Sequence, residues 1–351
     1  MNDLKYIPCV IMRGGTSRGP FFLASDLPKQ VSQRDNILLS IMGAGHPLQI
    51  DGIGGGNPVT NKVAIVGPAT VPNADVDYLF AQIRNLEGIV DTSPNCGNML
   101  SAVGPFAIEA GLVYPTEPIT FVKIHNINTG EIIEAEVPVV GNAVCYNGTS
   151  AIDGVPGTGA GIYLNFLNSA NGDFTSLFPT EKTIEVINGI AVTCINSAIP
   201  LVLIDPAPLN VTAHETAQEL NANKHLIDQI AAIRQEAGLK MGLGDVRNKV
   251  IPKPVLLSTS KKKSTINARY FMPDECHPSL ATTGAVGIAV ATTIENTLAS
   301  QLSGKQNTPT DIIIDHPSGS LSLTIRNRDG RNIVSLLRTT RRIFQGAALL
   351  K

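Results

Sequence analysis

The feature that most constrains the fold of this chain is a faint internal repeat. Lys62 and Cys96 are separated by 34 positions, and Lys249 and Thr283 are separated by the same 34 positions. Each lysine follows a glycine-rich turn and opens an apolar, strand-like run, and Cys96 and Thr283 each stand at the start of a helix-like run of small apolar residues. The two copies lie about half a chain apart. The repeat therefore predicts two duplicated domains rather than a solenoid, whose units span roughly 20 to 50 residues.

The chain has 351 residues, of which 43% are hydrophobic, with 32 glycines and 23 prolines, enough to build two loop-rich domains that contain much sheet. We predict a first domain over residues 1–180, completed by a C-terminal strand at 335–351, and a second over 181–334. Each half is expected to wrap a sheet around one apolar helix, at 99–110 and at 285–298. Other helices are predicted at 35–42 and 217–237. Strands are predicted at 6–12, 21–23, 63–66, 119–127, 132–139, 143–146, 184–187, 190–195, 254–258 and 266–271.

Charge and cysteine content exclude several functions. The net charge of −2 argues against a nucleic-acid or anionic-membrane surface. The five cysteines are widely spaced with no C-x-x-C pattern, which predicts neither a disulfide framework nor a metal site. The N-terminal residues lack the apolar core of a secretion signal, and the uncharged stretch 278–294 is rich in Gly, Ala and Thr, as in a packed helix. We expect a cytoplasmic protein with neither a membrane nor a nucleic-acid partner.

The sequence Ser93-Pro94-Asn95-Cys96-Gly97-Asn98 is the strongest candidate for chemistry. It precedes the helix-like run that begins at Met99, so Cys96 would face backbone N–H groups that have no partner within the helix. Those groups and the helix dipole stabilise a thiolate and also bind a substrate carboxylate. A free cysteine is often a small core residue instead. Asn and Gly on both sides make Cys96 a poor core residue and favour the reactive interpretation.

Two glycine-rich loops supply further candidates. Arg13-Gly14-Gly15-Thr16-Ser17-Arg18-Gly19 combines close backbone approach with hydroxyl and guanidinium groups that suit a carboxylate, although an ordinary surface turn is an equal alternative. The second loop, residues 52–61, leads to Lys62 at the entrance of an apolar strand. Desolvation there would favour the neutral amine, so Lys62 is a candidate general base or a fixed cation. A lysine that merely extends from a strand end to solvent is the alternative.

Taken together, these motifs resemble one known family. The strings that carry the resemblance are residues 12–19 (MRGGTSRG), 51–55 (DGIGG), 62–65 (KVAI), 94–98 (PNCGN), 152–157 (IDGVPG), 241–245 (MGLGD), 283–285 (TGA) and 338–341 (RTTR). In this order they are similar to the PrpF family, which includes 2-methylaconitate cis–trans isomerase and 4-oxalomesaconate tautomerase. The resemblance runs through essentially the whole chain and is closer to the oxalomesaconate tautomerase branch.

The resemblance implies an α+β fold of the diaminopimelate-epimerase-like kind, with two duplicated domains and the active site in the cleft between them. In the related epimerases two cysteines, one in each domain, exchange a proton on carbon without a cofactor. Here the counterpart of Cys96 is Thr283, and a threonine hydroxyl is far too weak an acid for that role. The family pattern instead pairs Cys96 with Lys62.

The sequence thus predicts a cofactor-independent isomerase that moves a proton within an unsaturated di- or tricarboxylate. Cys96 and Lys62 are the predicted catalytic residues, and the sequence does not decide which of them acts as the base. The oligomeric state is also left open, with a homodimer as one possibility. Helix starts and polar loops would bind the small anionic polycarboxylate. The predicted binding residues are Thr16, Ser17, Arg18, Asn57, Thr60, Asn61, Asn95, Gly97, Asn98, Met99, Thr282, Thr283, Gly284 and Ala285.

Three alternatives remain from the sequence. A racemase or epimerase of a small acid would use the same cleft but needs two competent bases that flank one carbon. A polycarboxylate-binding protein on a retired enzyme scaffold predicts ligand binding without turnover. A redox-sensing role for Cys96 predicts selective oxidation of its thiol by mild peroxide.

Overall fold

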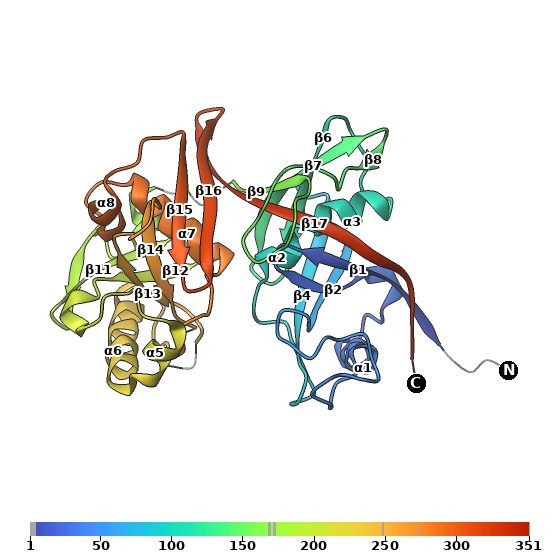
Figure 1. The fold of residues 1–351 in the computed structure, drawn as a ribbon, viewed down its shortest axis with the longest axis horizontal. Helices are drawn as coiled ribbons and strands as arrows, with labels where there is room; N and C mark the ends of the chain where they lie inside the picture. The colour runs from blue at the N-terminus through green and yellow to red at the C-terminus, as the bar shows by residue number, and fades with distance from the viewer. Residues whose placement is uncertain (1–4, 168–169, 171–172, 248, 273, 351) are drawn as a thin grey trace. The chain divides into compact units, whose positions relative to one another are not determined.

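The computed structural model describes residues 5–350 except 168, 169, 171, 172, 248 and 273. It divides into two compact units, Met1–Asn165 together with Leu337–Lys351, and Phe166–Leu336. β17 (Arg331–Leu349) carries the chain from the second unit back into the first (Figure 1). The structural division falls in β9 because that strand pairs with β7 and β17 of the first unit. The boundary at residue 180 stays a sequence prediction.

The first unit contains a closed ring of eight paired strands. Around the ring the order is β1-β2-β3-β4-β6-β7-β9-β17, and β17 returns to β1. The β2–β3 and β4–β6 pairs are parallel, and β5 pairs with β4 outside the ring. The strands are β1 (Tyr6–Gly14), β2 (Ser17–Leu23), β3 (Lys62–Pro68), β4 (Val76–Arg84), β5 (Ile89–Asp91), β6 (Ile119–Asn126), β7 (Glu131–Val140), β8 (Ala143–Val144) and β9 (Gly161–Phe166).

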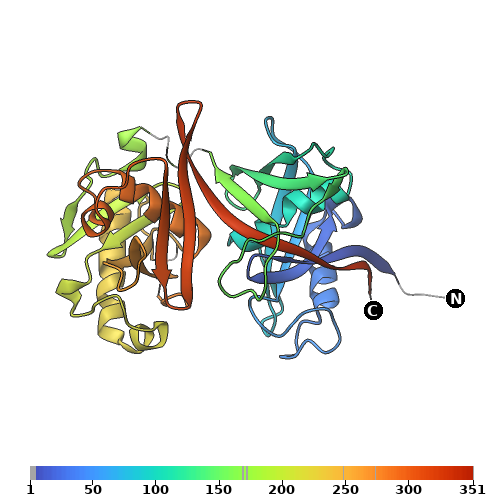
Figure 2. The same cartoon turned by 45° about the horizontal axis from the view of Figure 1, so that its top comes forward.

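A helical segment is packed inside this ring. The predicted single helix at 99–110 is in fact two, α2 (Gly97–Leu100) and α3 (Val103–Glu109). Pro105 explains the interruption, because it has no N–H to donate to the carbonyl of Ser101 and its ring crowds the preceding turn. Every α3 residue from Val103 to Ile108 is buried, as expected for a helix with strands around it (Figure 2). The 3-10 turn η1 (Ala24–Asp26) follows β2.

α1 (Val31–Met42) lies outside the ring and begins four residues before the predicted start. It buries Leu38, Ile41 and Met42 in an apolar cluster with side chains of β1–β4. Gly43 ends the helix in the left-handed conformation (φ 69°), and its N–H is bonded to the carbonyls of the last turn.

The second unit is built on the same plan. Its sheet runs β10-β11-β12-β13-β14-β15-β16-β17, with parallel β12–β13 and β14–β15 pairs. α7 is buried along nearly its whole length and packs with α8 on the sheet, while α5 and α6 pack through a separate apolar cluster. The elements are α4 (Phe174–Leu177), β10 (Glu185–Ile187), β11 (Ile190–Asn196), β12 (Pro200–Ile204), η2 (Ala207–Leu209), α5 (Ala217–Ala222), α6 (Lys224–Lys240), β13 (Lys253–Ser258), β14 (Ile266–Tyr270), α7 (Thr282–Thr293), α8 (Leu298–Ser303), β15 (Thr310–His316) and β16 (Gly319–Arg328).

Two predicted helices of this unit are interrupted. The predicted helix at 217–237 breaks at Asn223, whose side chain accepts a hydrogen bond from Leu226 N and caps α6. The predicted helix at 285–298 begins earlier, at Thr282, and ends at Thr293. Thr297 then caps α8, with its hydroxyl accepting from Ser300 N. In both cases a local side-chain cap competes with helix continuation.

The two units repeat an order of strand pairing. In each, an antiparallel hairpin is followed by a strand that pairs in parallel with the second strand of the hairpin, and these strands are β3 and β13. Lys62 is the first residue of β3 and Lys253 is the first residue of β13. Lys249 lies in the loop before β13. The strand after Lys249 starts four residues later than the sequence spacing implies.

Lys253 yields a stability prediction. Burial, reinforced by the positive charge of Arg234, lowers the pKa of Lys253 to about 8. Between pH 8 and the ordinary value of about 10.5 the unfolded chain binds more protons than the folded one, so native stability rises with pH across this window. Lys253→Met is expected to raise the free energy of unfolding by roughly 1–2 kcal/mol at pH 7. Urea titrations should show that gain shrinking by pH 9.5. An equal gain at both pH values would contradict this explanation.

Candidate active site

Cys96 is the residue directly before α2, as the sequence predicted. Its side chain is 8% exposed, and its carbonyl accepts hydrogen bonds from Leu100 N (3.0 Å) and from the Tyr78 hydroxyl (3.3 Å). The first amides of α2, from Gly97 onward, have no acceptor within the helix. Burial raises the pKa of Tyr78 well above its usual value. The phenol therefore stays protonated and holds the Cys96 peptide in place.

Amide side chains fix the loop that carries Cys96. Asn95 Oδ1 accepts a hydrogen bond from Asn126 Nδ2 (2.7 Å), and Asn126 is fully buried at the end of β6. Asn128 donates to the carbonyls of Phe80 (2.9 Å) and Thr92 (2.8 Å). In this structure Asn95 is thus a structural anchor of the loop. Its predicted contact with substrate stays a proposal.

The glycines of the β1–β2 hairpin allow it to pack directly on the start of α2. A methyl group at Gly14 would lie 2.3 Å from the carbonyl oxygen of Asn98. One at Gly19 would lie 1.8 Å from the carbonyl oxygen of Lys62 and 3.2 Å from the terminal methyl of Met99, which is fully buried. Only glycine permits these approaches. The hairpin therefore brings the backbone at Lys62 and the first turn of α2 to the same place.

Lys62 is half-buried, and its ammonium group is held by two residues of the adjacent strand β4. Nζ donates to Gln82 Oε1 (2.8 Å) and lies 5.1 Å from the centroid of the Phe80 ring. Tyr78, Phe80 and Gln82 alternate along β4 and so share one face. That face holds the Cys96 peptide through Tyr78 and the Lys62 amine through the other two. Neither β4 nor Gln82 was predicted from the sequence.

Gln82 is expected to position Lys62. Its Nε2 donates to the carbonyls of Asn61 (2.8 Å) and Pro58 (3.2 Å), which turns Oε1 toward the amine. Gln82→Glu would replace this neutral acceptor with a carboxylate and hold the ammonium form. Turnover is then expected to fall about tenfold at neutral pH, because the amine is less free to give up a proton. Turnover equal to wild type would show that Gln82 does not act through Lys62.

The other loop residues are bonded mainly to one another. Asn57 Oδ1 accepts from Val59 N (3.0 Å), the Thr60 hydroxyl donates to the Asn57 carbonyl (3.0 Å), and buried Asn61 accepts from Gly55 N (3.4 Å). Arg18 reaches the same loop: a methyl group at Gly55 would meet Arg18 Nη2 at 3.0 Å. Ser17 is buried beside Arg18. The structure thus gathers Arg18, Ser17 and the loop, with Asn57 and Thr60 shaping its turn.

A buried arginine that was not predicted from the sequence as a site residue contacts Asn98, two residues after Cys96. Arg338 of β17 donates from Nε to Asn98 Oδ1 (3.1 Å), and Asn98 Nδ2 donates to the exposed Thr16 hydroxyl (3.0 Å). Burial lowers the pKa of Arg338 to about 10. The guanidinium is therefore charged at neutral pH. The motif at 338–341 was the available signal, but nothing in it indicated proximity to Cys96.

The remaining predicted residues belong to the second unit. Thr282, Thr283, Gly284 and Ala285 form the first turn of α7, which follows Ala281. Gly284 permits close packing, because a methyl group there would lie 2.4 Å from the Tyr270 ring. Thr282 is buried and Thr283 is half-buried. Their part in substrate binding stays a prediction.

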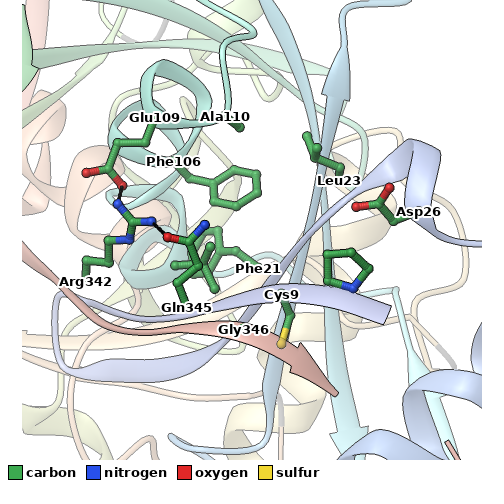
Figure 3. A pocket seen from close by; sticks show the side chains of 12 residues that line it. Cys9, Phe21, Leu23, Asp26, Phe106, Glu109, Ala110, Arg342, Gln345 and Gly346 are labelled. Atoms are coloured by element: carbon green, nitrogen blue, oxygen red, sulfur yellow. Dashed lines mark hydrogen bonds and ion pairs between the residues drawn. The ribbon is translucent and has the colours of Figure 1, made fainter. Parts of the chain in front are cut away.

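A cavity of the first unit lies elsewhere, at the other end of α3 (Figure 3). Phe21 and Phe106 line its apolar side, and Arg342 forms an ion pair with Glu109 (3.3 Å) at its edge. Burial raises the pKa of Cys9, which also lines it. Neither Cys96 nor Lys62 is among the lining residues.

Within the described ranges, no set of three or more His, Cys, Asp or Glu side chains is grouped as metal ligands would be. No described helix has the length and apolar character of a membrane span.

Comparison with known proteins identifies the family. Residues 4–351 match the family model described as PrpF protein. The chain is 51% identical to the YbhH protein of Escherichia coli strain K12, over 99% of this chain and 100% of that one. It is 41% identical to 4-oxalomesaconate tautomerase of Pseudomonas putida, over 98% and 96% of the two chains.

Two solved structures are similar to this chain over nearly its whole length. The crystal structure of a methylitaconate-delta-isomerase has a TM-score of 0.87 at 33% identity and covers 99% of this chain and 96% of its own. A hydroxyproline epimerase from Agrobacterium vitis shares the fold, with a TM-score of 0.56 at 12% identity over 98% and 93% of the chains. The fold is diaminopimelate-epimerase-like, and the protein is an isomerase. The chain belongs to the PrpF family.

Proposed function

We propose that this isomerase moves a proton within an unsaturated di- or tricarboxylate such as 4-oxalomesaconate, with Cys96 and Lys62 as the two proton-carrying groups and no cofactor. The shared face of β4 is the observation that carries the proposal. Tyr78 of that face bonds the peptide of Cys96, and Gln82 and Phe80 hold the amine of Lys62. A thiol and an amine ordered from one rigid strand suit acid–base work on a single bound acid.

The proton balance is closed by these two groups. One of them, as thiolate or neutral amine, removes a proton from a carbon conjugated with a carbonyl or carboxylate group. The electron pair of the broken C–H bond delocalises onto oxygen and gives a dienolate. The other group, as thiol or ammonium, donates a proton elsewhere on the conjugated system. The double bond moves, and solvent exchange restores both groups.

Fixed donors near Cys96 would stabilise the dienolate charge. The free amides at Gly97, Asn98 and Met99 and the Thr16–Asn98 pair lie at the start of α2, and Arg18 lies beside the neighbouring loop. By analogy with oxyanion holes, a preorganised donor of this kind contributes about 3 kcal/mol to transition-state stabilisation. We include Ser17, Asn57, Thr60, Asn61 and Asn95 as residues that shape this region, and Thr282–Ala285 as a second binding segment.

The second candidate is 2-methylaconitate cis–trans isomerisation, which would use the same allylic proton transfer. The similarity to 4-oxalomesaconate tautomerase favours the first candidate. A racemase mechanism is disfavoured, because Thr283 stands where the repeat would place a second thiol.

The direct assay incubates the purified protein with 4-oxalomesaconate, 2-methylaconitate or trans-aconitate. Ultraviolet absorbance then measures the movement of the conjugated double bond. We expect turnover of 4-oxalomesaconate above the other two. Turnover of 2-methylaconitate alone would select the second candidate. Thermal stabilisation by all three acids without turnover would replace both candidates with a binding function.

A further inference from the structure

Arg338 is a buried cation whose charge is not balanced by a protein carboxylate. Its side chain is 9% exposed. Nε donates to Asn98 Oδ1 (3.1 Å) and Nη1 to the carbonyl of Leu337 (3.0 Å), and both acceptors are neutral. Among the residues that the structure describes, no Asp or Glu forms an ion pair with it. Buried charges in proteins are as a rule paired, and this guanidinium has no carboxylate partner among the described residues.

The position of Arg338 is fixed from several sides. A methyl group at Gly15 would lie 2.2 Å from Asn98 Oδ1 and 3.1 Å from Arg338 Cδ, so the glycine of the β1–β2 turn packs against both side chains. Thr16 holds the other end of the Asn98 amide. Nε and Nη1 each make one bond, and Nη2 makes none to the described residues. The Nη edge of the fork thus retains donors that suit bidentate binding of a carboxylate.

We propose that Arg338 binds a carboxylate group of the substrate beside Cys96, with Asn98 and Thr16 as its positioning residues. The inference rests on the proposed function, since the ligand is the unsaturated polycarboxylate itself. A guanidinium there would neutralise a carboxylate conjugated with the reacting carbon and would favour the dienolate.

The test measures affinity without turnover. Propane-1,2,3-tricarboxylate is saturated and cannot isomerise, so calorimetric titration reports binding alone. Arg338→Gln is expected to weaken its affinity about 10- to 100-fold, because a charge-assisted bidentate contact is lost. Arg338→Lys keeps the charge but not the fork and is expected to recover only part of the affinity. Arg341→Gln, an exposed arginine of the same strand, is the matched control and is expected to bind like wild type.

Alkylation of Cys96 by iodoacetamide across pH separates this role from a purely electrostatic effect on the thiol. An alkylation profile that shifts in Arg338→Gln while tricarboxylate affinity stays at the wild-type value would overturn the proposal. So would equal loss of affinity in Arg341→Gln. Circular dichroism verifies that each variant is folded. Failure of the proposed function would appear differently, as wild-type protein that binds the tricarboxylate through Arg338 yet isomerises none of the three candidate substrates.

Discussion

Replacing Cys96 with alanine is expected to lower turnover by about 10³- to 10⁴-fold, because one of the two proton-carrying groups is removed. Alanine retains the backbone hydrogen bonds at the start of α2, including the one that the Tyr78 hydroxyl donates to the carbonyl of residue 96. The lost sulfur is small, so unfolding should be easier by only about 1 kcal/mol. Steady-state absorbance assays and a thermal melt measure the two quantities.

Cys145→Ala is the matched control for this variant. Cys145 is a half-buried thiol of the same unit, and its Sγ donates to the carbonyl of Asn147. Its loss should leave turnover within about twofold of wild type. Full activity in Cys96→Ala would exclude the thiol from the reaction.

Replacing Lys62 with methionine is expected to lower turnover by about 10²- to 10⁴-fold with little loss of stability. Methionine has a similar length and can still pack over the Phe80 ring, but it cannot exchange a proton or bond to Gln82. A general acid or base lost from this position should lower kcat more than it raises KM. Stopped-flow and steady-state assays distinguish the two parameters.

Lys123→Met, at an exposed position of β6, is the control for removal of one lysine charge. It should retain wild-type kinetics. If Lys62→Met raised KM at unchanged kcat, Lys62 would be a fixed cation for a substrate carboxylate and the second proton carrier would have to be sought elsewhere.

The sequence predicts the local parts of the site well. Pro94, Asn95 and Gly97 end one segment and start a helix, and the structure places Cys96 directly before that helix. The glycines of the first hairpin indicate close backbone approach, which Gly14 and Gly19 show. These features depend on neighbouring residues, so local chain chemistry is enough to find them.

Contacts between distant segments could not be predicted in this way. Arg338 meets Asn98 across 240 positions of sequence, and only the return of β17 beside β1 brings them together. Gln82 requires the register of β3 with β4, in which it lies opposite Lys62. The equal spacing that matched Lys62 with Lys249 also did not reveal the loop before β13, in which Lys249 lies and after which the strand begins at Lys253.

The polar residues of the loop at 52–61 show another limit. Asn57 and Thr60 have the composition of a binding loop, yet their side chains satisfy the backbone of their own turn. Asn and Thr are common in turns for this reason, and composition alone does not separate that use from ligand binding.

The central claim is that two different groups act at two carbons of one bound acid, and solvent deuterium tests it most directly. In deuterated buffer, wild-type enzyme should place deuterium at the carbon that gains the proton. Either Cys96→Ala or Lys62→Met, whichever retains the base, should exchange the substrate's acidic C–H without forming product. NMR of recovered substrate and product resolves these positions. Isomerisation at the wild-type rate in both variants, or deuterium found only at the carbon that was deprotonated, would contradict the claim.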